Sequence, residues 1–153
     1  MRAHELAEPY PTVRLDTSAL DAARLLAERR LPGLIVVDDH DHPIAVLPGS
    51  QFLRLVIPHY VQDDPTLARV LDEAASDRMC APLAGRTVAD LLPKDRPRLP
   101  VVQQHDTGME IAAIMAGTRS PLVAVVADKS RTAPLIGAVS VSRLLSLLLP
   151  APE

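Results

Sequence analysis

The sequence contains the same segment twice, and this duplication constrains the fold more than any other feature. When the chain is aligned with itself at an offset of 89 residues, 11–39 lies over 100–128, and nine of the 29 aligned positions are identical. Unrelated segments of this Ala- and Leu-rich composition would share roughly two or three identities. After three extra residues in the second copy, 44–56 aligns with 136–148 at an offset of 92. The sequence therefore predicts two copies of one structural unit.

Both copies carry the same local signals in the same order. Ser18 with Asp21, and at the equivalent positions Thr107 with Glu110, have the spacing of a capping box, which provides partners for the first amides of a helix. Apolar residues follow at helical spacing, and a proline ends each predicted helix. The runs LIVVD and VAVVAD then predict buried strands, each followed by a polar turn, a second strand and a second helix. Each copy is therefore predicted to be a β-α-β-β-α unit.

Composition and charge exclude several classes of partner. Aromatic residues make up 2% of the chain and the formal net charge is -3, so the sequence offers neither stacking platforms nor a basic patch for nucleic acid. The N-terminus lacks the apolar region of a signal peptide. The longest apolar tract, LLSLLLP at 144–150, is shorter than the roughly 20 residues of a spanning helix. We therefore expect a cytoplasmic protein that binds no nucleic acid and does not insert into membranes.

The segment DDHDHP, residues 38–43, gathers acidic and imidazole side chains that could suggest a metal site. It falls between two predicted strands, where the second copy has ADKSRTAP, and Asp and Pro are favoured in turns because they bond the local backbone or preset φ. Neighbouring residues at a strand end also point in opposite directions, whereas metal ligands converge on one point. The segment is interpreted as a hairpin turn, with an adventitious divalent-cation site as the alternative; no metal site is predicted.

No catalytic motif is found in the sequence. The chain lacks G-x-G, G-x-S-x-G and H-E-x-x-H patterns, and its single cysteine, Cys80, is interpreted as a small buried residue, although His59 and His105 could in principle act as a base. We predict a protein that is not an enzyme and has no catalytic residues.

Residues 57–86 have no counterpart in the repeat. Asp64 followed by Pro65 predicts a helix N-cap and first position, and apolar residues at Leu67, Val70 and Leu71 continue the stripe of a helix with Ala74 and Ala75. Such a stripe must be buried against the same chain or against another one. The sequence leaves both alternatives open, a helix that caps its own core or one that mediates dimerisation or partner docking.

The two copies together resemble a tandem cystathionine β-synthase (CBS) domain pair, the Bateman module. The resemblance rests on RLPGLIVVDDHDHPIAVLPGSQFL and RSPLVAVVADKSRTAPLIGAVSVSRLL, and RAHELA and TVADLL stand where the family often has a short lead-in. It implies an α+β fold with two β-α-β-β-α units packed about a pseudo-twofold axis, plus the helical insert. The expected domains are the first CBS domain with its lead-in at 1–56, the insert at 57–86, the second CBS domain at 87–149 and a tail at 150–153.

The resemblance also implies clefts between the units that bind adenosine-type ligands such as AMP, ADP, ATP or S-adenosylmethionine, with no cofactor required. Ligand-binding members have a Gly-h-h-Ser/Thr-x-x-Asp pattern in which the hydroxyl meets phosphate and the acid holds the ribose. Here the first copy places Pro48 and Gln51 at these two positions, and the second places Ser140 and Arg143 there. The expected ligand-binding residues are Arg30, Pro32, Gly33, Leu34, Gln51, Arg119, Ser120, Pro121, Leu122, Ser140, Ser142 and Arg143.

These departures leave two functions open. Loss of the acid removes a hydrogen bond to a charged group and should weaken ribose recognition by roughly ten- to a hundredfold, whereas Arg143 could hold a phosphate instead, or could be only an exposed residue at a helix start. The leading expectation is a homodimeric regulatory module that senses an adenine nucleotide and modulates a separate enzyme or transporter. The alternative is a ligand-free adaptor with degenerate pockets.

Overall fold

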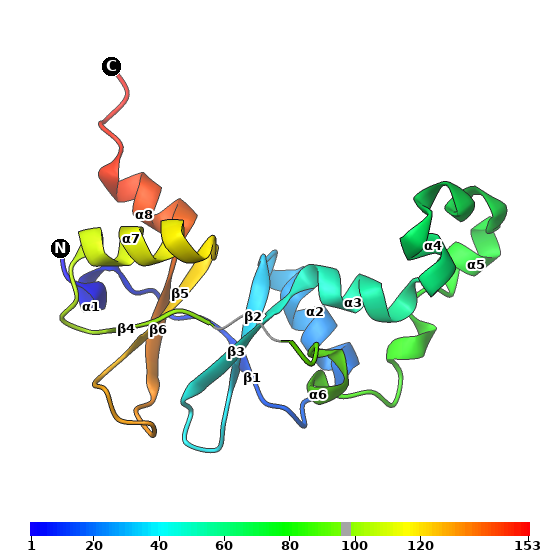
Figure 1. Ribbon diagram of the computed structural model, residues 1–153, viewed down its shortest axis with the longest axis horizontal. Helices are drawn as coiled ribbons and strands as arrows, with labels where there is room; N and C mark the ends of the chain where they lie inside the picture. The colour runs from blue at the N-terminus through cyan, green and yellow to red at the C-terminus, as the bar shows by residue number, and fades with distance from the viewer. Residues whose placement is uncertain (96–98) are drawn as a thin grey trace. The chain divides into compact units, whose positions relative to one another are not determined.

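The structure, a computed structural model, describes residues 1–95 and 99–153 and contains two three-stranded sheets with their helices (Figure 1). The first sheet has the strand order β1 (Thr12–Val13), β2 (Gly33–Val37), β3 (Pro43–Pro48), and the second β4 (Val101–Gln103), β5 (Leu122–Val126), β6 (Leu135–Ser140). The α+β class and the repeated strand pattern are confirmed. The main helices are α2 (Ala19–Arg29), α3 (Gly49–Val56), α7 (Gly108–Thr118) and α8 (Val141–Leu148), and the short ones are α1 (Ala3–Leu6) and α6 (Val88–Leu91).

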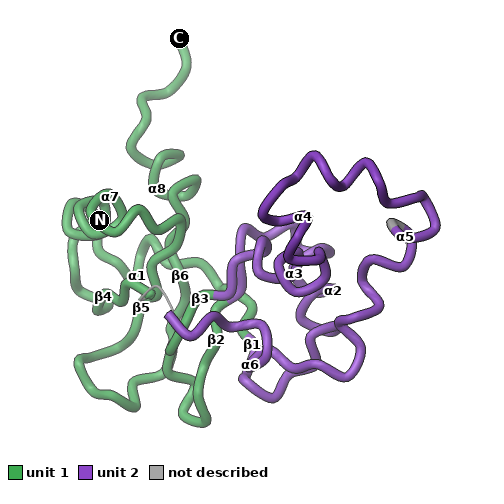
Figure 2. Tube along the Cα trace, turned by 45° about the vertical axis from the view of Figure 1, so that its right-hand side comes forward, with its two compact units in different colours: residues 1–12, 35–46, 97–153 green, residues 13–34, 47–96 purple. Residues whose placement is uncertain are grey.

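The chain forms two compact units whose boundaries do not follow the two copies of the repeat (Figure 2). Unit 1 consists of 1–12, 35–46 and 97–153, and unit 2 consists of 13–34 and 47–96. The domain boundaries expected from the sequence follow the repeat instead, and they stay a prediction.

The first helix of each copy begins and ends as its sequence indicates. The Ser18 hydroxyl accepts from the Asp21 amide at 3.4 Å, and Thr107 and Glu110 form a complete capping box. Both helices end at an arginine in the left-handed conformation, Arg30 with φ 51° and Arg119 with φ 54°. The predicted helix starts and stops are therefore confirmed in both copies.

The strands that follow these helices are buried along their whole length, as continuous apolar runs predict. β5 pairs with β4 in parallel and with β6 in antiparallel fashion. Within unit 1, one face of the second sheet packs against α1, α7 and α8, and its other face carries Ala124 and Ala138, which pack with Ile35, Val37 and Leu99. Each large apolar side chain that these two layers bury fully contributes about 1.5 to 3 kcal/mol to folding.

The two short lead-in helices each dock on the other copy of the repeat. In unit 1 the Ala3 and His4 amides of α1 donate to the Asp106 and Gln104 carbonyls, at 2.8 and 2.9 Å. In unit 2 the Val88 and Ala89 amides of α6 make the equivalent bonds to Thr17 and Leu15, at 2.9 and 3.0 Å. The partners differ by the repeat offset of 89 residues. The lead-ins are therefore exchanged between the copies, with the same docking geometry each time.

The insert between the copies differs from its predicted form. Asp64 does act as an N-cap, because its carboxylate accepts from the Thr66 amide at 3.2 Å, but the helix it starts is a short 3-10 helix, η1 (Pro65–Val70). The chain then becomes extended at Leu71 (φ -82°, ψ 134°), and Asp72 accepts from the Ala75 amide as the next helix begins. The prediction of one amphipathic α-helix is therefore wrong. The insert comprises α4 (His59–Asp63), η1, α5 (Glu73–Asp77) and η2 (Ala81–Leu83).

Several apolar residues of the insert face solvent. Leu67 and Leu71 are each 38% exposed and Val70 is 76% exposed. Cys80 is also exposed, so its interpretation as a buried residue is wrong. Across 1–95 and 99–153, no helix has the length and apolar character that crossing a bilayer requires.

Candidate functional site

In unit 1, the expected ligand-binding residues of the second copy meet where β6 runs into α8. The Ser140 hydroxyl caps α8 by accepting from the Arg143 amide at 3.0 Å. The Pro121 carbonyl accepts from the Val141 amide at 3.1 Å, which brings the loop of 119–122 to the start of the same helix. The loop is closed locally by Ser120, whose hydroxyl donates to the Leu122 carbonyl at 2.7 Å. Ser142 is exposed on the first turn of the helix.

Arg143 does not extend freely into solvent. Its Nε donates to the Leu6 carbonyl of α1 at 3.4 Å and lies 3.5 Å from the Glu8 carboxylate. The side chains of Arg143 and Glu8 are 33% and 53% exposed. The guanidinium at this helix start is therefore held by the N-terminal lead-in, whose residues the repeat alignment did not indicate as part of a site.

Unit 2 contains the equivalent junction, formed by β3 and α3. The Pro32 carbonyl accepts from the Gly49 amide at 3.2 Å, so that Arg30, Pro32 and the start of β2 lie beside the first turn of α3. Pro48 occupies the N-cap position without a side-chain cap, and the Gln51 side-chain amide donates to the Leu91 carbonyl of α6 at 3.2 Å. Each unit therefore assembles its own set of expected residues.

The strand residues of the two sets have buried side chains. Leu34 and Leu122 are 0% and 1% exposed, and Gly33 has no side chain to offer. At these positions only backbone atoms remain for recognition of a ligand, and the role of these residues in ligand binding stays a prediction.

The residues of the Asp38–His42 segment form a turn, as predicted. The Asp38 carboxylate accepts from the His40 and His42 amides at 2.9 and 3.0 Å. Desolvation acts to raise the pKa of Asp38, but these two hydrogen bonds and the nearby His40 and His42 outweigh it and lower the pKa. His42 Nδ1 must carry a proton, because its partner at 2.7 Å is the Ala133 carbonyl, which can only accept. Within the described residues, no group of three or more His, Cys, Asp or Glu side chains is placed to hold a metal ion.

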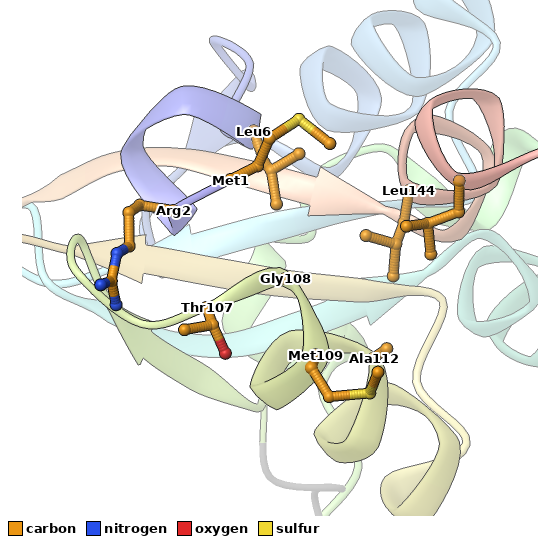
Figure 3. Close-up of a pocket in the computed structure, with 9 residues that line it drawn as sticks. Met1, Arg2, Leu6, Thr107, Gly108, Met109, Ala112 and Leu144 are labelled. Atoms are coloured by element: carbon orange, nitrogen blue, oxygen red, sulfur yellow. The ribbon is translucent and has the colours of Figure 1, made fainter.

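Two hollows adjoin the lead-in helices. A pocket of about 370 Å³ in unit 1 lies between α1, α7 and α8, and Figure 3 shows Leu6, Met109, Ala112 and Leu144 around it. Its lining is mainly apolar, with Arg2 and Thr107 at one end (Figure 3). A pocket of about 420 Å³ in unit 2 is lined by α3, α4 and α6, and it includes Gln51, Arg54 and Asp90.

Sequence reasoning missed the residues that the lead-ins contribute. The acceptors for Arg143 and Gln51 are backbone carbonyls, which carry no sequence signature. Glu8 is a side chain, but it lies 135 residues from Arg143 along the sequence, and only the exchange of the lead-ins brings the two together.

Comparison with known proteins gives a consistent result. Residues 3–57 match the CBS domain family, and no curated protein matches the chain. A CBS domain-containing protein of unknown function from Kribbella flavida is 53% identical, with 98% of this chain and 99% of that one covered and a TM-score of 0.86.

More distant structures share the fold. The CBS domain of a membrane protein from Sphaerobacter thermophilus is 23% identical, covering 97% of this chain and 88% of that one with a TM-score of 0.70. The CBS-pair protein CBSX2 from Arabidopsis thaliana is 21% identical, covering 95% and 92% with a TM-score of 0.72, and CBSX2 has also been crystallised with AMP. The chain therefore belongs to the CBS-domain family, as a tandem pair of CBS domains.

Proposed function

We propose that this protein is a non-catalytic regulatory module that binds an adenosine-type nucleotide and modulates a separate enzyme or transporter. The observation that carries the proposal is the β6–α8 junction, where Arg143 stands in the first turn of α8, whose N-cap is Ser140. The N-terminal end of a helix attracts anions, and arginine is well suited to a phosphate. The AMP complex of CBSX2, which shares the fold, supports an adenine nucleotide as the ligand class.

The ligand has to compete with contacts inside the chain. A phosphate that binds the Nε of Arg143 must replace the Leu6 carbonyl and the Glu8 carboxylate there. An exposed ion pair contributes about 0 to 1 kcal/mol and a net hydrogen bond about 0.5 to 1.5 kcal/mol, so this competition weakens the affinity by roughly two- to seventyfold without preventing binding. This loss adds to the roughly ten- to a hundredfold weaker ribose recognition that the missing acid predicts, so we expect adenylate ligands to bind weakly.

Thermal melting with a panel of ligands tests the proposal. A ligand at one hundred times its dissociation constant stabilises the folded state by about 2.7 kcal/mol, which corresponds to roughly 5 to 11 °C for a chain of this size. The panel comprises AMP, ADP, ATP, S-adenosylmethionine, NAD and cyclic dinucleotides. Arg143→Ala should reduce the shift, whereas Arg24→Ala, which removes an exposed arginine from α2, should leave it unchanged. Flat curves for every ligand would reject nucleotide sensing.

The second candidate, a ligand-free adaptor, is favoured by one specific observation. Gln51 and Arg143 stand at the two positions where ligand-binding relatives are expected to have the acid. Both side chains already have partners, Gln51 the Leu91 carbonyl and Arg143 the Leu6 carbonyl. An adaptor would need no further ligand at these junctions. The same ligand panel separates the two functions.

We also propose that the protein is a homodimer. α8 buries Leu144 but leaves Val141, Leu145 and Leu148 between 40% and 58% exposed, and Met109 on α7 is 79% exposed. Apolar residues gathered on one face of a helix pair indicate a protein interface. If this face forms the dimer, Leu148→Glu should give monomers in sedimentation velocity. Val70→Glu, which changes an even more exposed apolar residue in the insert, is the comparison variant. If it alone gave monomers, the interface would lie in the insert.

A further inference from the structure

The lead-in helices α1 and α6 are too short to be stable alone. Each has four residues, whereas isolated helices need roughly 12 to 15 residues even for favourable sequences. Their positions are therefore set by docking. The last carbonyl groups of a helix have no partner within the helix, and at the final residue of each lead-in, Leu6 or Leu91, a side chain from the docking surface provides one.

The two side chains that do this occupy equivalent positions. Gln51 is the third residue of α3, and Arg143 is the third residue of α8, and the two align at the repeat offset of 92. Their acceptors Leu91 and Leu6 are likewise the last residues of equivalent helices. The two copies thus differ in side-chain chemistry but keep a long side chain with an N–H donor at the same place. A carboxylate at this position could not bond to the carbonyl of the lead-in, because both groups only accept hydrogen bonds.

We propose that Gln51 and Arg143 are latch residues: each holds the exchanged lead-in helix by donating to its last carbonyl. The latches differ in strength and in sensitivity to salt. The Gln51 latch is a bond between neutral groups, whereas Arg143 also pairs with Glu8, two residues beyond Leu6, through partly exposed charges. Salt screens exposed ion pairs, so the N-terminal lead-in is the one that salt loosens. This inference does not depend on whether a nucleotide binds.

Hydrogen exchange of the full-length protein tests the latches. The amides of Ala3, His4 and Ala7 report on α1, and those of Val88, Ala89 and Leu92 report on α6, because each is hydrogen-bonded in the structure. Loss of one net hydrogen bond should raise local exchange about two- to twelvefold.

Reciprocity distinguishes a latch from general destabilisation. Arg143→Met should raise exchange in α1 only, and Gln51→Met in α6 only. Arg143→Gln supplies the donor of the first copy to the second and should restore most of the protection of α1. If either Met variant left its own lead-in unchanged, or loosened both lead-ins equally, the latch assignment would be wrong.

The salt dependence provides a second readout that a purely structural role would not change. Raising NaCl from 0.05 to about 1 M should increase exchange in α1 by up to about fivefold and leave α6 unchanged. Arg143→Gln and Glu8→Gln should each abolish the salt response while α1 stays docked. An equal response of both lead-ins, or a response that persists in both variants, would reject the role of the ion pair.

Discussion

Gly137→Ala, which adds a single methyl group, tests most directly whether the N-terminal lead-in docks on the second copy of the repeat. Gly137 lies in β6, and a Cβ added there would stand 2.6 Å from the Glu8 carbonyl oxygen and 3.2 Å from the Ala7 Cβ. Its φ is not in the left-handed region, so an alanine would be strained only by this contact. A carbon normally stays roughly 3.3 Å or more from a carbonyl oxygen, so the lead-in would have to retreat by about 0.7 Å.

That retreat would disturb a two-way backbone bridge. The Glu8 amide donates to the Ala138 carbonyl and the Ala138 amide donates to the Glu8 carbonyl, both at 3.0 Å. Overpacking of this kind costs about 1 to 3 kcal/mol. For a chain of about 150 residues, Gly137→Ala should therefore lower the melting temperature by roughly 2 to 12 °C. Urea unfolding should show the same loss of free energy.

Gly117→Ala is the matched control for this prediction. Gly117 lies in α7, and a Cβ added there has no atom within 4 Å. Alanine is favoured over glycine in a helix by about 0.5 to 1 kcal/mol, so this variant should be more stable than the parent. If Gly137→Ala were as stable as the parent while Gly117→Ala gained stability, the lead-in would not lie against β6 as described.

Three further predictions concern single groups. The pKa of Asp38 is lowered in the folded protein, so its contribution to stability is present above the ordinary carboxyl range and is lost as pH falls through this lowered pKa. Asp38→Asn should therefore flatten the acid side of a pH–stability curve. Burial raises the pKa of Tyr10 to about 12. The chain has no tryptophan and two tyrosines, so in Tyr60→Phe the tyrosinate absorbance reports on Tyr10 alone and should titrate near 12, whereas a midpoint near 10 would contradict the burial. The free energy of unfolding should fall as pH rises from about 10 toward 12. Ser140→Ala should cost about 1 kcal/mol in urea unfolding because α8 loses its N-cap, and an unchanged midpoint would contradict that role.

Local signals in the sequence determine much of this fold. The capping residues, the helix ends, the buried strands and the Asp38 turn were predictable because each depends on residues within a few positions of one another. The duplication then extended every local prediction to the second copy. A prediction made for one copy was thereby supported by the same signal in the other. The α+β class followed from the order of the predicted helices and strands.

The exchange of the lead-ins and the form of the insert depend on other interactions. An apolar stripe predicts a continuous helix only if packing buries the stripe, and in the insert Leu67, Val70 and Leu71 stay exposed. The side-chain caps formed by Asp64 and Asp72 are then favoured over a continuous helix, and they divide the segment into two short helices. The lead-ins are held largely by backbone carbonyls, which every sequence contains, so their docking partners could not be identified from residue types.

One signal of the exchange was nevertheless present in the sequence. A glycine inside a strand often marks a close approach of another backbone, and Gly137 is such a glycine, whereas the first copy has Ala45 at the equivalent position. In unit 1 the approaching backbone is that of Glu8, which both donates to and accepts from β6. The residue at the equivalent place in the second lead-in is Pro93, which has no N–H and cannot form a two-way bridge. The difference between Gly137 and Ala45 therefore agrees with the chemistry of the two lead-ins: Glu8 bonds to β6 in both directions, whereas Pro93 has no N–H with which to do the same at β3.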